Sequence, residues 1–91
     1  MHMTELIGKM VVGEQAQTIG EVSDIEFDEK TMKLTNIYVK LKENAIETMG
    51  LKKPRLGSVK VDIPVDAIKA ISDIVALNKS TQELKTIVRR R

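Results

Sequence analysis

The chain has 91 residues, the size of one small domain, and its hydrophobic 42% is almost entirely aliphatic because Phe27 and Tyr38 are the only aromatic residues. A net charge of +2 does not by itself indicate nucleic-acid binding, and the lack of cysteine excludes disulfides, thiolate metal sites and cysteine nucleophiles. No apolar run is long enough to span a bilayer, and the N-terminus has no signal-peptide features, so we expect a cytoplasmic protein.

The first two strands are predicted over residues 6–13 and 19–28, which are apolar, rich in β-branched residues and punctuated by glycine. In the second, the apolar positions are three apart before they begin to alternate. This spacing indicates a bulge or bend, which we place near Ser23 and Asp24, and small barrels use such bends to curl a sheet. Residues 28–31 follow as a polar hairpin loop.

Two later strands, over residues 33–42 and 58–64, show the clearest alternation of apolar and polar positions. The residues predicted to point inward are Ile37, Val39 and Leu41 in one strand and Val59, Val61 and Ile63 in the other. Between them, residues 43–49 predict one or two turns of helix that end at Gly50.

The C-terminal third is less uniform. The periodicity of residues 65–77 suits either a helix or two short strands around Ser72 and Asp73. Ser80 and Glu83 form a capping box, which predicts a helix that continues into the terminal arginines. We therefore expect a β domain over residues 1–79, with residues 1–3 as a cloning remnant and natural start, and a helix with a basic tail over 80–91.

Five acidic residues fall within nine positions of the second strand and its loop: Glu21, Asp24, Glu26, Asp28 and Glu29. They raise the question of a metal or catalytic site. Neighbouring side chains on one face of a strand are about 7 Å apart, too far to share an ion without help from other strands, and no calcium-loop pattern is present. A solvated strand face is the favoured interpretation.

The residues do not indicate an enzyme or a cofactor site. No glycine-rich phosphate motif occurs, and His2 is the only histidine, so a Ser-His pair is unavailable. The basic residues Lys52, Lys53 and Arg55 form an exposed loop that could contact an acidic partner, protein or RNA, although no aromatic residue is interleaved for base stacking.

Some apolar residues fall on strand faces that are predicted to be exposed to solvent. Leu34 and Tyr38 lie opposite the inward set of the third strand, and Met10 and Val12 alternate with Val11 in the first. This second apolar set must pack within the chain or against another chain. The residues that we single out for a partner or dimer interface are Leu34, Tyr38, Met49 and Leu51.

Ten positions follow a recognisable pattern: Gly8, Lys9, Val11, Ile19, Gly20, Val22, Asp24, Asp28, Pro64 and Asp73. They spell a Gly-Lys-x-Val opening, an Ile-Gly-x-Val-x-Asp strand, an acid before the hairpin, and a Val-x-Ile-Pro strand followed by an apolar pair around an aspartate. In this pattern the sequence resembles the PRC-barrel family. The resemblance favours two strands over residues 65–77.

The resemblance implies a small antiparallel β-barrel of about five or six strands that works as an adaptor. The family includes the photosynthetic reaction-centre H subunit, ribosome-maturation factors and short stand-alone archaeal proteins, some linked to cell division. This chain resembles the stand-alone type with a C-terminal helix.

We therefore expect a non-enzymatic protein-binding adaptor that forms a homodimer, with an archaeal cell-division component as its most specific version. The alternative is an RNA-associated or ribosome-assembly factor that uses loop 52–55, although nucleic acid is the less favoured partner. We expect no cofactor, metal or small-molecule substrate. A metal-dependent enzyme that uses the acidic residues is the least favoured hypothesis.

Overall fold

A computed structural model describes residues 5–52 and 57–90 of the chain, which is mainly β with two short helices. The strands are β1 (Met10–Val12), β2 (Thr18–Asp28), β3 (Lys33–Leu41), β4 (Lys60–Pro64), β5 (Ile68–Ile71), β6 (Ile74–Leu77) and β7 (Arg89–Arg90). The helices are α1 (Glu43–Met49), the 3₁₀ turn η2 (Val65–Ala67) and α2 (Thr81–Leu84). The first strand is shorter than the predicted 6–13, because a turn precedes Met10.

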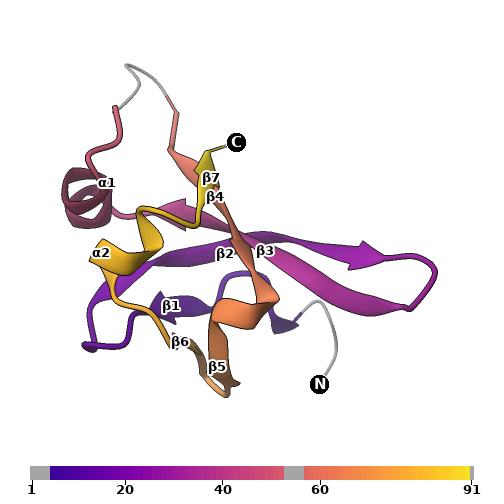
Figure 1. Cartoon of the computed structure of the whole chain (residues 1–91). Helices are drawn as coiled ribbons and strands as arrows, with labels where there is room; N and C mark the ends of the chain where they lie inside the picture. The colour runs from indigo at the N-terminus through magenta and orange to yellow at the C-terminus, as the bar shows by residue number, and fades with distance from the viewer. Residues whose placement is uncertain (1–4, 53–56, 91) are drawn as a thin grey trace.

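The strands form one sheet in the order β5-β6-β1-β2-β3-β4-β7 (Figure 1). The prediction of an antiparallel barrel needs correction in two respects. β1 and β6 run parallel, and in the described part of the chain no ladder joins β5 to β7, so the sheet is not closed. The parallel pair arises because the β5–β6 hairpin returns the chain to the free edge of β1 in the direction of β1 itself.

The predicted bend in β2 is confirmed. The register with β3 shifts between Val22 and Asp24, which leaves Ser23 as the extra residue of a bulge. The Ser23 hydroxyl donates a hydrogen bond to the carbonyl of Tyr38 at 3.1 Å. β4 pairs with β3 as far as Asn36, and past this point β2 and β3 extend from the body as a two-stranded ribbon (Figure 1).

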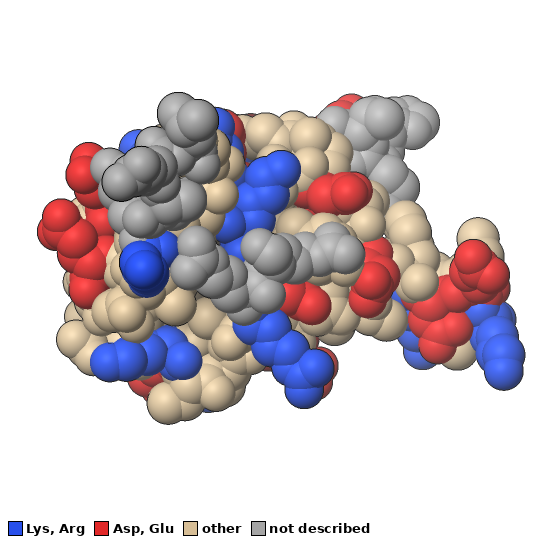
Figure 2. All heavy atoms as spheres, turned by 90° about the horizontal axis from the view of Figure 1, so that it is seen from above, with Lys and Arg blue, Asp and Glu red and all other residues tan. Residues whose placement is uncertain are grey.

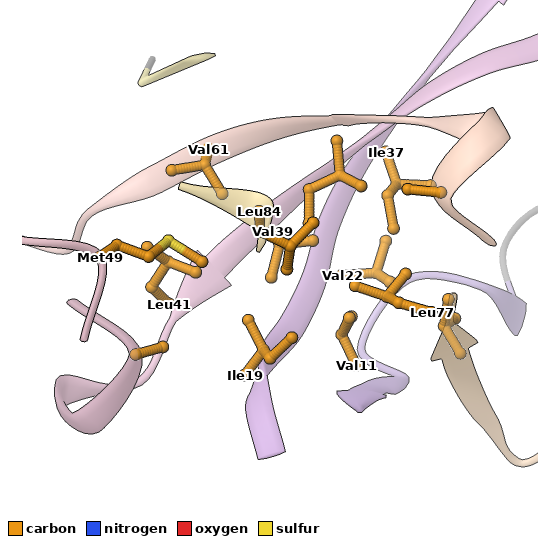
Figure 3. Close-up of a cluster of buried hydrophobic side chains, with 14 of the residues drawn as sticks. Val11, Ile19, Val22, Ile37, Val39, Leu41, Met49, Val61, Leu77 and Leu84 are labelled. Atoms are coloured by element: carbon orange, nitrogen blue, oxygen red, sulfur yellow. The ribbon is translucent and has the colours of Figure 1, made fainter. Parts of the chain in front are cut away.

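The core lies between the curved sheet and the two α-helices. Side chains from strands and helices converge there, among them Val11, Ile19, Val39, Met49 and Leu84 (Figure 3). All six residues predicted to point inward from β3 and the β4 segment are buried. The alternation of the sequence therefore identified the core face correctly in these two strands.

Helix α1 was predicted with the correct bounds. Gly50 terminates it in the left-handed conformation, with φ of 69°, and its N–H donates to the last turn. The two strands predicted around Ser72 and Asp73 are also confirmed, as β5 and β6.

The C-terminal helix is much shorter than predicted. The capping box is present, since the Ser80 hydroxyl accepts from the Glu83 N–H and the Glu83 carboxylate accepts from the Ser80 N–H. However, α2 ends at Leu84, and Arg89–Arg90 pair as a strand with Val61 and Asp62 of β4. The free edge of β4 offers backbone partners there that a helix would leave unused.

Candidate interaction surface

The sheet has a face that points away from the core, here called the outer face. Its side chains lie in rows, because residues paired across neighbouring strands point to the same side. One row runs through Ile74, Met10, Glu21, Lys40 and Lys60, on β6, β1, β2, β3 and β4 in turn. The outer face is therefore apolar on β6 and β1 and charged from β2 onward.

The apolar part, which we call the outer apolar patch, consists of Met10, Val12, Ala70, Ile74 and Ala76. In β1 and β6 these residues alternate with the buried Val11, Val75 and Leu77, so their outward direction follows from the pleat. Met10 is 44% exposed, Ala70 is exposed and the other three are half-buried.

Local contacts fix the edge of this patch. The Thr18 hydroxyl lies 3.8 Å from the sulfur of Met10, which places both side chains on the outer face. A hollow of about 300 Å³ adjoins Met10, lined also by Gly8, Gly20, Glu21 and Lys40 among others. The patch is thus bordered on the β2 side by a shallow depression with charges of both signs.

The charged part of the outer face is tied together by hydrogen bonds. The Tyr38 hydroxyl donates to Glu26 Oε2 at 2.6 Å, and the Asn36 amide donates to Asp62 Oδ1 at 2.5 Å. These bonds link β2 to β3 and β3 to β4. They satisfy polar groups on this half of the face.

The five acidic residues of β2 and its loop are all exposed, in agreement with the solvated-face interpretation. Asp24 accepts a hydrogen bond from the Ile25 N–H, and Asp28 accepts from Lys30 and Thr31 in the hairpin turn. These carboxylates cap the backbone locally. In residues 5–52 and 57–90, no three His, Asp or Glu side chains gather in a group that could hold a metal ion.

Two of the four interface candidates are buried within the chain itself. Tyr38 is 5% exposed, with its hydroxyl bonded to Glu26, and Met49, the last residue of α1, is 1% exposed in the core. Packing within the chain, the alternative left open by the sequence, accounts for both. The reason for assigning them to a partner surface is therefore gone.

Leu34 and Leu51 are half-buried and pack against the core. The register shift beyond Glu26 makes Thr35 an extra residue of β3, whose hydroxyl donates to the Glu26 carbonyl at 3.2 Å. Leu34 therefore pairs with Phe27 on the core side of the ribbon, not on the predicted outer side. Phe27 is 40% exposed and Met32 77%, because the ribbon extends past the body. A partner contact at Leu34 or Leu51 stays a prediction.

The basic loop is described only in part. Lys52 is exposed, whereas Lys53 and Arg55 lie outside the described residues. On the face shown in Figure 2, lysine and arginine are interspersed with acidic side chains, and acids also occupy the projecting ribbon. The described side chains on this face do not form a continuous basic surface and so give the RNA alternative no support.

A family model for the PRC-barrel domain matches residues 1–84. The chain belongs to the PRC-barrel family. No curated protein matches the chain. None of the helices in the described part of this PRC-barrel protein is long and apolar enough to cross a membrane.

The sequence indicated only part of the outer apolar patch. Met10 and Val12 stood out because they alternate with Val11, but Ile74 and Ala76 lay in the segment whose periodicity suited two structures. Their position beside Met10 and Val12 depends on the parallel β1–β6 pair, which no local pattern encodes.

Proposed function

We propose that this PRC-barrel protein is a non-enzymatic cytoplasmic adaptor that binds proteins, including a second copy of itself, through the outer apolar patch. The observation that carries the proposal is the apolar outer face of β6 and β1, where Met10, Val12, Ile74 and Ala76 lie side by side. Contiguous exposed apolar surface on a small protein typically marks an interaction site.

The flatness of this surface also favours a protein partner. A small molecule is usually bound in an enclosed, mostly apolar pocket, whereas the hollow beside the patch is half-open and lined by Glu21 and Lys40 as well as Met10. The patch supplies the dehydrated apolar centre of an interface, and the charges of Glu21, Lys40 and Lys69 around it supply a polar rim.

The finer version of the proposal is a stand-alone PRC-barrel of archaeal type that serves the cell-division machinery. Its support is the resemblance of the sequence to stand-alone family members. The chemistry of the patch is compatible with this role but is not specific to it.

A photo-crosslinking experiment in the native host tests the adaptor function. A photoreactive aromatic amino acid in place of Met10 is expected to capture protein on irradiation, because position 10 lies within the proposed contact. The matched control is the same amino acid in place of Met32, which is 77% exposed on the ribbon and outside the patch.

Protein adducts that form at position 10 and not at position 32 would support the proposal, and mass spectrometry would identify them. Equal capture at both positions, or adducts with RNA alone, would contradict it.

A further inference from the structure

We infer that the adaptor binds an acidic protein segment, whose apolar residues lie on the outer apolar patch and whose carboxylates reach a group of lysines beside it. The inference rests on the proposed function and adds the chemical class of the partner. The lysines are Lys40, Lys42 and Lys60, here called the lysine group, and all three are exposed.

The register of the sheet places the lysine group on the same face as the patch. Lys40 and Lys60 continue, on β3 and β4, the row that contains Met10. Lys42 lines the hollow beside Met10 together with Lys40, so it belongs to this face as well. The hollow of about 300 Å³ therefore connects the patch directly to two of the lysines.

The arrangement of the lysines is unfavourable for the isolated chain. Lys40 and Lys60 are paired directly across β3 and β4, and like charges in this position repel and destabilise a sheet. Glu21 is paired with Lys40 across the other ladder, and the Asp62 carboxylate on β4 accepts a hydrogen bond from the Asn36 amide. A pair that weakens the fold is explained if a partner supplies the opposite charge.

The spacing of the row defines what the partner must present. Neighbouring strands are about 4.8 Å apart, so Lys40 and Lys60 lie roughly 10 and 14 Å from Met10 across the strands. A complementary segment therefore has an apolar residue and carboxylates separated by this distance. Such a separation corresponds to about two turns of helix or three to four residues of extended chain.

A protein segment fits this face better than RNA does. Glu21 lies between the patch and the lysines in the row, and a protein segment can place a neutral residue over it. Each nucleotide of RNA carries a phosphate charge, which Glu21 would repel and which gains nothing from the apolar half of the face.

Fluorescence anisotropy with two synthetic peptides tests the charge of the partner. One peptide carries leucines followed by glutamates, and the other carries lysines in place of the glutamates. The wild-type chain is expected to bind the leucine–glutamate peptide with a dissociation constant on the order of 100 μM, because the contact is small, and the leucine–lysine peptide at least about tenfold more weakly. The difference should shrink between about 50 and 500 mM NaCl, since salt screens exposed charges.

Reversal of the paired lysines tests the site. The double variant Lys40→Glu and Lys60→Glu is expected to exchange the preference and to bind the leucine–lysine peptide at least about threefold more tightly than the leucine–glutamate peptide. Loss of folding could not produce this gain. Lys30→Glu, the same change at an exposed position of the ribbon, should leave the wild-type preference unchanged.

Lys60→Glu alone separates binding from stability. It converts the repulsive pair with Lys40 into an attractive one, so the melting temperature is expected to rise by about 1–5 °C. The affinity for the leucine–glutamate peptide is expected to fall roughly three- to tenfold. A fall in both quantities would show that Lys60 supports the fold, and would overturn its role in binding.

The remaining outcomes distinguish the partner from the adaptor function. A wild type that binds the two peptides equally, binds neither, or prefers oligouridylate to the leucine–glutamate peptide would overturn the inference. Photo-capture at position 10 that persists in the Lys40→Glu and Lys60→Glu double variant, on a partner segment without acidic residues, would overturn the acidic partner and leave the adaptor function standing. Absence of any protein capture at position 10 would contradict both.

Discussion

Gly20 lies where the backbones of β2 and β3 leave no room for a side chain. A Cβ atom there would be 2.1 Å from the carbonyl oxygen of Lys40, which is backbone and cannot rotate away. We predict that Gly20→Ala destabilises the fold by about 3 kcal/mol or more, because one strand must shift. Denaturant unfolding measures this.

Gly13→Ala provides the matched control for Gly20. The added Cβ would meet the side-chain tip of Ile19 at 3.1 Å, and that tip can move by a few tenths of an ångström. A cost of about 1 kcal/mol or less is expected. If the two substitutions cost the same free energy of unfolding, the close approach of the β3 backbone at Gly20 would not be the cause of the destabilisation.

At single residues, some features could be predicted from the sequence and others could not. The three-residue spacing of apolar positions correctly located the bulge at Ser23, because the spacing is a direct consequence of the extra residue. The burial of Tyr38 was not predictable in this way. Tyr38 points to the outer side of β3, and its burial depends on neighbours from β2 and β4 that only the register identifies.

Among the elements, α2 depends on its N-terminal cap because it is only four residues long. The Ser80 N–H bonded to the Glu83 carboxylate, together with the Ser80 hydroxyl, lowers the pKa of Glu83 below its usual value of 4.5. A carboxylate whose pKa is lower in the folded state stabilises the fold above its ordinary pKa, and this contribution fades as the pH falls through the folded pKa.

We therefore predict that Glu83→Gln lowers stability at neutral pH, and that the difference from the wild type shrinks below about pH 4.5. Thermal unfolding across this range measures both chains. Glu29→Gln, the same change at an exposed loop position without a capping bond, serves as the control for the loss of one acidic residue. A constant difference for Glu83→Gln across the range would argue against the role of its ionised carboxylate.

Elements were predicted best where two signals agreed. Helix α1 has both its apolar spacing and Gly50, and β3 has strict alternation. The predicted helix over 80–91 had a start signal but no stop signal, and its last residues pair with the edge of β4 instead. The edge that captures them belongs to another part of the chain, so the local pattern could not indicate it.

For the whole molecule, the family resemblance predicted the class of fold and the order of most elements. It did not predict the open, mixed sheet, because pairing between distant strands leaves no trace in local periodicity. The outer apolar patch has the same origin, since it is assembled from β1, β5 and β6 and is recognisable only when their register is known.

The parallel pairing of β1 with β6 has a consequence for folding. The Gln17–Thr81 hydrogen bond joins residues 64 positions apart, and Met10 and Ile74 are equally distant along the chain. Contacts of such high sequence separation require closure of a long loop and form after the local hairpins. A chain still on the ribosome therefore lacks the outer apolar patch until β6 has emerged.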